Sequence, residues 1–232
     1  MAAEYPKIVK NRKLNRTLTN PMISKMKCVI FAGGTDYGTS PAISPDDLVI
    51  AADSGYNACR ARGITPHLAV GDWDSLEDTD MECQRVNLPV DKDDTDTLAA
   101  IRIGIERGFR EFHIICGTGG RIDHTIANMQ SLVFLAKQCK RGFLYDEGSV
   151  VTAVTDGEML FPVGAKGGVG VFAADGNAQG VTIKGLKYTL DNAVLTADFP
   201  VGVSNSFVGK ESVIAVKKGT LYVVFPTGVF PL

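Results

Sequence analysis

The sequence predicts a parallel-sheet α/β domain followed by an all-β sandwich domain. The first half of the 232-residue chain alternates short apolar runs with helical patterns, which is typical of a parallel sheet covered by helices on both faces. The second half consists of β-rich runs separated by turn residues, and no Cys, His, Arg or Trp occurs after Arg141. We therefore expect three parts: an N-terminal arm (1–26), an α/β nucleotide-binding domain (27–143) and a β-sandwich (144–232).

In the first half, each apolar run stops at a glycine or an aspartate, and three segments carry helical signals. Strand-like runs are 27-KCVIFAGG-34, 48-LVIAADSG-55, 68-LAVGD-72 and 111-EFHIICG-117. Helical patterns cover 56–62, 95–108 and 123–139.

In the second half, the β-rich runs are 149–161, 168–175, 180–190 and 212–225. The last of these runs contains 217-KKGT-220 between two apolar stretches, a pattern typical of a hairpin.

Composition narrows the class of protein. The net charge is −2, which argues against a nucleic-acid partner. No apolar run reaches the ~20 residues that a membrane-spanning helix needs, and the polar, basic N-terminus lacks the apolar core of a signal peptide. We therefore expect a cytoplasmic protein without a membrane partner. Five cysteines without a CxxC pair indicate reduced thiols and no thiolate zinc site.

Four glycine- and aspartate-containing segments follow the expected parallel strands. They are Gly33–Gly34, 53-DSG-55, 71-GDWDS-75 and 117-GTGGRIDH-124. One such segment alone is typical of a tight turn. Ligands of open α/β sheets bind at the carboxyl ends of the strands, so four together predict a shared binding crevice.

Acidic residues are concentrated between Asp72 and Asp96, where ten carboxylates accompany only two basic side chains. Residues 77–82 are typical of a solvated loop. Asp72 and Asp74 lie two apart after an apolar strand, so in extended backbone both point the same way and need a cation between them. Oxygen ligands without His or Cys suit Mg²⁺. Asp96 is a natural third ligand, with helix capping as the alternative.

The segment 117–124, in contrast to this acidic region, carries groups that bind anions. Its three glycines permit close approach of a ligand to the backbone, and a helix N-terminus that binds phosphate follows. Arg121 can bind phosphate in bidentate fashion, and His124 either reaches the phosphate or makes a structural hydrogen bond. Neither GxxxxGK[ST] nor GxGxxG occurs here. Taken alone, these residues predict a Mg²⁺-dependent transferase or hydrolase acting on a nucleotide.

Six motifs, in this order and spacing, resemble the thiamine pyrophosphokinase (thiamine diphosphokinase) family over residues 27–226. They are 52-ADSG-55, 70-VGDWDS-75, 91-DKDDTD-96, 119-GGRIDH-124, 185-GLKYTL-190 and 202-GVSNSF-207. The resemblance implies an enzyme that transfers the diphosphoryl group of ATP to the hydroxyl of thiamine, giving thiamine diphosphate and AMP. It also implies a homodimer with active sites between subunits.

The resemblance implies a role for each matching residue. The Mg²⁺ ligands are Asp72, Asp74 and Asp96. The groups near the ATP phosphates are Gly33, Gly34, Lys92, Gly117, Gly119, Gly120, Arg121 and His124. Thiamine lies near Thr95 and Asp96, with Ser204 and Asn205 of a partner subunit. The catalytic set is Asp53, Asp72, Asp74, Asp96 and Arg121, and either Asp96 or Asp53 accepts the hydroxyl proton.

The chain departs from the family pattern at one point. Some members carry a Trp near the thiamine ring in the second domain, whereas the only Trp here is Trp73, in the metal loop. Phe207 or Phe199 is then expected to supply the aromatic surface.

Three other functions compete with this interpretation. A diphosphokinase for another acceptor, such as a hydroxymethylpterin, would share the ATP half but not GLKYTL and GVSNSF. A non-catalytic thiamine or nucleotide sensor would have lost Asp72, Asp74 or Asp96. A carbohydrate-binding β module fused to a hydrolase would carry exposed aromatic loops, and the second half has no Trp.

Overall fold

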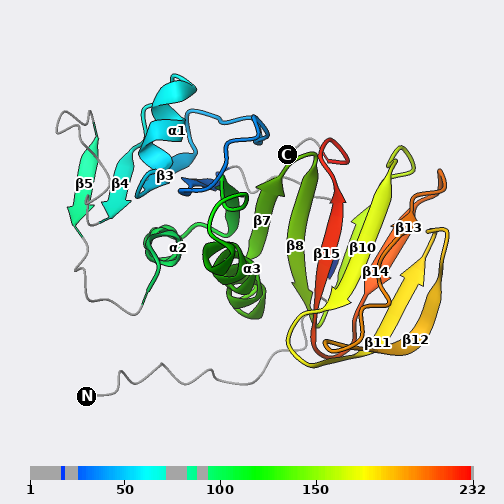
Figure 1. Ribbon diagram of the computed structural model, residues 1–232. Helices are drawn as coiled ribbons and strands as arrows, with labels where there is room; N and C mark the ends of the chain where they lie inside the picture. Colours follow the sequence, from blue (N-terminus) through cyan, green and yellow to red (C-terminus); the bar gives the residue numbers. More distant parts are fainter. Residues whose placement is uncertain (1–16, 19–25, 72–82, 88–93, 231–232) are drawn as a thin grey trace, which may run out of the picture.

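The computed structural model describes residues 17–18, 26–71, 83–87 and 94–230. Within these residues the strands form a ten-stranded and a five-stranded sheet, and three helices pack on the ten-stranded one (Figure 1). The first half contains β1 (Thr17–Leu18), β2 (Cys28–Phe31), β3 (Leu48–Ala52), α1 (Gly55–Ala61), β4 (Leu68–Gly71), β5 (Gln84–Asn87), α2 (Asp96–Glu106), β6 (Glu111–Ile115) and α3 (Ile122–Lys137).

The second half is β-rich. Its strands are β7 (Arg141–Asp146), β8 (Ser149–Thr155), β9 (Glu158–Phe161), β10 (Gly168–Ala173), β11 (Asn177–Lys184), β12 (Leu190–Thr196), β13 (Asn205–Ser206), β14 (Ser212–Ala215) and β15 (Thr220–Pro226). Helices lie only in the first half of the described chain, so the predicted fold class is confirmed.

The parallel part of the large sheet runs in the order β7-β6-β2-β3-β4-β5. Its central strands are buried on both faces because helices cover both. Val29 and Phe31 of β2 belong to the core that includes residues of α1, whereas Cys28 and Ile30 belong to the core that includes α2 and α3. This double burial explains why the strands appear in the sequence as continuous apolar runs.

The β-rich part continues the same sheet. Strand β8 pairs antiparallel with β7, and the order continues through β15, β10 and β13. The second sheet, β1-β9-β14-β11-β12, packs its apolar residues into a shared core, where Ile214 and Val181 meet Val223 and Phe225. The expected domain boundary after residue 143 therefore falls inside β7, a strand that joins the two parts.

The predicted hairpin around residues 217–220 is wrong. Strand β14 pairs with β9 and β11 in the small sheet, whereas β15 pairs with β8 and β10 in the large one. Both strands carry alternating apolar residues, and both point them into the core between the sheets. The link between them therefore crosses from one sheet to the other, a corner that local sequence does not distinguish from a hairpin.

Two strands of the parallel sheet were not expected. Strand β5 lies at the edge of the sheet, and its mostly exposed residues leave no apolar pattern. Strand β7 was interpreted as the domain boundary because a change of composition coincides with it.

The N-terminal arm contributes one described element, β1, which pairs in parallel with β9 of the small sheet. The rest of the arm, residues 1–16 and 19–25, lies outside the described residues. In the part of the chain that is described, no helix is both long and apolar enough to cross a membrane.

Candidate active site

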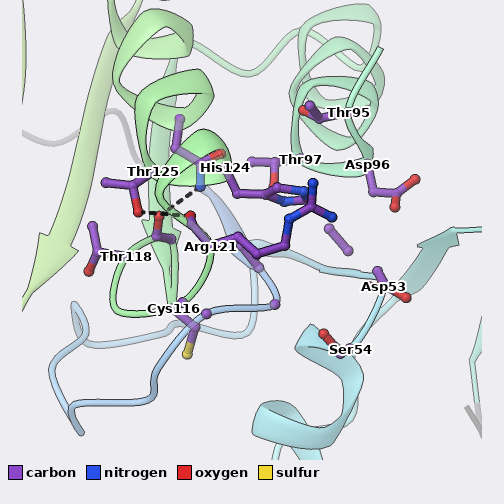
Figure 2. Close-up of a pocket in the computed structure, with 17 residues that line it drawn as sticks. Asp53, Ser54, Thr95, Asp96, Thr97, Cys116, Thr118, Arg121, His124 and Thr125 are labelled. Carbon is purple, nitrogen blue, oxygen red and sulfur yellow. Dashed lines mark hydrogen bonds between the residues drawn. The ribbon is translucent and has the colours of Figure 1, made fainter. Parts of the chain in front are cut away.

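A pocket of about 280 Å³ opens at the carboxyl ends of β2, β3 and β6. Strand β2 is the first strand of the parallel sheet and pairs with both β3 and β6, so the connections on its two sides lead in opposite directions. Ligands of open α/β sheets bind at such a switch point. The pocket is lined by Ala32, Gly33, Gly34, Ala52, Asp53, Ser54, Thr95, Asp96, Thr97, Cys116, Gly117, Thr118, Gly120, Arg121, His124, Thr125 and Asn128 (Figure 2).

Asp53 forms the acidic side of the pocket, directly after β3. Its backbone has a positive φ of 50°, and its N–H donates to the carbonyl of Val70 at 2.8 Å. Its Oδ1 atom is buried and has no hydrogen-bond partner among the described residues. A buried carboxylate oxygen without a donor is costly, and a bound cation or hydroxyl would remove that cost. Asp53 therefore has the character of a ligand-binding residue.

Asp96 lines the same pocket at the first turn of α2. The helix cap is Thr95, whose Oγ1 accepts a hydrogen bond from Leu98 N at 3.2 Å. Asp96 is therefore not needed as the cap, which weakens the alternative raised from its position in the sequence. The Thr95 hydroxyl is already used by the helix.

Asp72, Asp74 and Lys92 lie outside the described residues. The last residue of β4, Gly71, lies beside Asp53, since a Cβ on Gly71 would come within 3.4 Å of Asp53 Cα. Within the described part of the chain, no group of three His, Cys, Asp or Glu side chains could hold a metal ion. Asp53 and Asp96 nevertheless face the pocket with hard oxygen atoms, which fits Mg²⁺ better than a softer metal.

The glycine-rich loop, residues 116–121, forms the opposite side of the pocket. Gly34 N donates to Cys116 O at 2.7 Å, and a Cβ on Gly34 would come within 2.2 Å of Thr118 O. Gly33 is similarly close to Ser54, with 2.4 Å from its ideal Cβ to Ser54 Oγ. These glycines are therefore required for the close packing of neighbouring loops as well as for access to a ligand.

The predicted glycines of the loop are not equivalent. Gly117 and Gly120 line the pocket, whereas Gly119, with a φ of 75°, is packed against Thr35 and Tyr37 and does not. Gly119 thus permits the left-handed turn of the loop.

Arg121 is the N-cap residue of α3 and has no side-chain capping bond. Its side chain is 72% exposed and points from α3 toward the side of the pocket that carries Asp96 and Asp53 (Figure 2). The guanidinium pairs with Asp123 at 2.5 Å, and this hydrogen bond holds the pKa of the Asp123 carboxyl below its usual value. Arg121 is thus an exposed cation, ion-paired with Asp123, at an open helix N-terminus, which suits phosphate.

His124 lies in the first turn of α3 and lines the pocket. Its backbone N–H donates to Asp123 Oδ1 at 3.0 Å, but its ring has no hydrogen bond to any described residue. The structural hydrogen bond considered from the sequence is therefore not found within the described part of the chain.

Several lining residues were not singled out from the sequence. Thr125 and Asn128 follow Arg121 by four and seven residues, so they lie on the same face of α3. Helical spacing from Arg121 was the signal that could have identified them. Ser54 and Thr118 lie within the segments 53-DSG-55 and 117-GTGGRIDH-124, which were expected at the crevice, although neither residue was named there as a site residue.

The predicted residues of the β-rich half do not line this pocket. Asn205 is 7% exposed, and its side chain holds Tyr188 by accepting from Tyr188 N at 2.9 Å and donating to Tyr188 O at 2.8 Å. Asn205 thereby ties the GLKYTL segment to the GVSNSF segment. Ser204 is exposed with a positive φ of 65°.

The two candidate aromatic residues differ in their surroundings. Phe207 is 9% exposed and packs against Phe161 in the core, with ring centroids 5.1 Å apart. Phe199 is 66% exposed. Phe199 is therefore the one of the two that is free to contact a ligand or a second subunit.

The pocket as a whole places carboxylates on one side and backbone amides with a guanidinium on the other. A negatively charged group bound to a cation matches both sides at once.

Two family models match the chain, one in each half. Residues 40–143 match the model described as thiamin pyrophosphokinase, catalytic domain, and residues 162–221 match thiamin pyrophosphokinase, vitamin B1 binding domain. A curated relative, thiamine pyrophosphokinase of Bacillus subtilis (strain 168), is 26% identical over 189 residues, covering 78% of this chain and 87% of its own.

Solved structures share the whole fold. Thiamine pyrophosphokinase of Bacillus subtilis superposes with a TM-score of 0.75 at 23% identity, covering 88% of this chain and 99% of its own. A thiamin pyrophosphokinase family protein from Enterococcus faecalis gives 0.73 at 24% identity, with 87% and 99% covered. Yeast thiamin pyrophosphokinase gives 0.71 at 15% identity, with 97% and 96% covered. The chain therefore belongs to the thiamine pyrophosphokinase family, which the matched models in both halves establish.

Proposed function

We propose that this chain is a thiamine diphosphokinase that uses Mg²⁺ and ATP. It transfers the diphosphoryl group of ATP to the hydroxyl of thiamine and releases thiamine diphosphate and AMP. The observation that carries the proposal is the pocket at the switch point of the sheet, with the unpartnered Oδ1 of Asp53 on one side and the glycine-rich loop and Arg121 on the other.

The phosphates of ATP lie against the glycine-rich loop in this proposal. The amides of Gly117 and Gly120 and the N-terminus of α3 face the negative charge, with His124 beside them. Arg121 reaches the phosphate that is attacked, where it stabilises the charge that develops in the transition state. Lys92 adds a second cation.

The residues proposed to hold Mg²⁺ are Asp72, Asp74 and Asp96, with Asp53 beside them. The ion, when bound, neutralises the phosphate oxygens and makes the attacked phosphorus more electrophilic. Asp53 or Asp96 orients the thiamine hydroxyl and accepts its proton. Thr95 places its methyl side and backbone near the same substrate.

A homodimer completes the site in this proposal. The partner subunit supplies the Ser204–Asn205 segment and the aromatic surface of Phe199 for thiamine. Exposed apolar side chains support an interface: Phe199, Val201 and Val203 lie on the β-rich half, and Ile122 and Ile126 lie on the first turns of α3 beside the pocket. We infer a cytoplasmic enzyme, where ATP and reduced thiols are both available.

Product analysis tests this function. The protein is incubated with Mg²⁺, ATP and thiamine, and the nucleotides and thiamine esters are separated. The proposal predicts AMP and thiamine diphosphate in equal amounts. ADP with thiamine monophosphate would instead mean transfer of the γ-phosphate and would contradict the proposed geometry.

The same assay separates the competing functions. AMP that forms only when a hydroxymethylpterin replaces thiamine would indicate the other diphosphokinase. Bound thiamine without turnover would indicate the sensor.

A further inference from the structure

Four successive carbonyl groups of the glycine-rich loop accept hydrogen bonds from groups outside the loop. The bonds are Gly34 N to Cys116 O (2.7 Å), Asn128 Nδ2 to Gly117 O (2.8 Å), Thr35 N to Thr118 O (2.8 Å) and Thr35 Oγ1 to Gly119 O (2.6 Å). The amides of residues 117–120, in contrast, have no acceptor among the described residues. These four carbonyls, together with the Thr118 hydroxyl that donates to Asp146 Oδ1 at 2.7 Å, hold the loop in place.

Holding the carbonyls determines where the amides point. In a trans peptide the C=O of one residue and the N–H of the next lie in one plane and point in opposite directions, and no peptide bond of the described chain is cis. The bond on Gly117 O therefore directs the amide of Thr118, and the bonds on Thr118 O and Gly119 O direct the next two amides. Each of these amides points away from its anchor.

Asn128 is the buried anchor. It is 4% exposed, lies on α3 seven residues after Arg121, and reaches back under the loop. A Cβ on Gly117 would come within 3.1 Å of Asn128 Nδ2 and within 2.5 Å of Leu144 Cδ1, so the loop packs closely against both side chains at this point. A hydrogen bond shielded from water is stronger than an exposed one and is costly to remove.

Thr35 is the anchor on the other side. Its backbone and side chain donate to two consecutive carbonyls, so it fixes the two peptide planes between Thr118 and Gly120. Its side chain is exposed, and water competes for the hydroxyl. Replacing the hydroxyl should therefore change the aim of the loop without threatening the fold.

We propose that Asn128 and Thr35 are positioning residues that aim the amides of the glycine-rich loop at the phosphates of the nucleotide. The inference rests on the proposed function, because it concerns the binding of ATP in the same pocket. Neither residue is required to touch the reacting atoms. Their effect is on the affinity for ATP and not on the affinity for thiamine.

The test compares Asn128→Leu and Thr35→Val with matched controls. Ser131→Ala removes another buried polar group of α3, whose hydroxyl bonds only to Ala127 O within the helix. Thr155→Val makes the same change at a threonine of β8, whose hydroxyl hydrogen-bonds to the Thr220 hydroxyl in the β-rich half. KM for ATP, KM for thiamine, kcat, the binding of Mg-ATP without thiamine, and the thermal midpoint are measured for each.

We expect each loop variant to raise the KM and the dissociation constant for ATP by roughly three- to tenfold, because each loses one hydrogen bond that positions the loop. The KM for thiamine should stay at the wild-type value, both controls should match the wild type, and Thr35→Ser should restore ATP binding. A lower thermal midpoint with unchanged ATP affinity would show a merely structural role and overturn the inference.

Three further outcomes are decisive. If Asn128→Leu does not fold, Thr35→Val decides alone, since its side chain is exposed. A wild-type protein that neither binds Mg-ATP nor forms AMP would count against the proposed function itself. A working wild type whose loop variants bind ATP equally well would count against the positioning role only.

Discussion

The charged side chains at the two ends of the parallel strands differ in how they are paired; we call these ends the amino edge and the carboxyl edge of the sheet. At the amino edge, Asp47 accepts bonds from Lys27 N and Ser44 N at 2.8 and 2.7 Å, and Glu111 contacts both His113 at 3.0 Å and Arg141 at 2.5 Å. At the carboxyl edge, Asp53 has a buried oxygen with no partner among the described residues, and Arg121 is mostly exposed and pairs only with the exposed Asp123 among them.

The contrast separates structural charge from functional charge. Buried ions that stabilise a fold are paired by that fold, because an unpaired one costs several kcal/mol. Charges that serve a ligand are left for the ligand to pair, at some cost in stability. Glu111 and the Oδ1 atom of Asp53 are both buried at strand ends of one sheet, so the ion pair to Arg141, and not burial, distinguishes the two carboxylates.

The largest expected effect is at the carboxyl edge. Asp72→Asn should lower kcat by about a thousandfold or more, because it removes a proposed metal ligand from the phosphates. The fold should remain, as judged by circular dichroism. Asp80→Asn, in the segment expected to be a solvated loop, is the matched control, and near-normal activity of Asp72→Asn would contradict the three-carboxylate metal site.

Arg121→Lys should lower kcat by about a hundredfold, since an ammonium cannot reproduce bidentate binding to phosphate. Its side chain is exposed, so the thermal midpoint should not change. Arg107→Lys, at the far end of α2, should behave as wild type. Equal activity of the Arg121 and Arg107 variants would remove Arg121 from the catalytic set.

At the amino edge the expected effect is on stability. Glu111→Gln should lower the free energy of unfolding by about 3 kcal/mol, because Arg141 loses its buried partner. Chemical denaturation measures the change, with the exposed Glu106→Gln as control. KM for ATP should stay at the wild-type value, and a loss of ATP affinity would mean that the two edges are not separate in function.

The smallest expected effect is the pH dependence of stability. Burial lowers the pKa of His113 below its usual 6.5, although Glu111 opposes this. Burial alone would raise the pKa of Glu111, but the hydrogen bond with His113 and the charge of Arg141 together outweigh burial and lower that pKa. Both groups bind fewer protons folded than unfolded at acidic pH, so stability is lost as pH falls below about 6.5. Between pH 7 and pH 5 the free energy of unfolding should therefore fall.

Thermal melts across this range measure that loss. A stability that rises toward pH 5 would show that His113 prefers the charged form in the fold. His113→Gln should flatten the dependence above pH 5.

The site could be predicted from the sequence at the points where a buried, apolar strand ends. Continuous apolar runs located β2, β3 and β6, and the glycines and aspartates that follow them form the pocket. Helical spacing from Arg121 could have placed Asn128 beside the pocket, but it could not have predicted the hydrogen bond from Asn128 to Gly117 O, eleven residues earlier in the chain. Tertiary contacts of this kind leave no local pattern.

The strand pairing and side-chain roles of the β-rich half were harder to predict from the sequence. Strands β14 and β15 have the sequence of a hairpin, but the core between the sheets separates them. Asn205 matches a motif expected to bind substrate, and in the fold its side chain joins two segments of its own chain. A motif identifies the family more reliably than it identifies which atom of the residue meets the ligand.

The most direct test of the two-edge account is the affinity of Asp53→Asn for ATP, measured by calorimetry with Mg²⁺ and with EDTA. Asparagine tolerates the positive φ of this position, so the change removes charge and little else. The account predicts that the variant binds ATP more weakly than wild type with Mg²⁺, yet more tightly in EDTA, where the carboxylate repels the phosphates. Equal affinities of the two proteins under both conditions would contradict a carboxylate reserved for a cation at this edge.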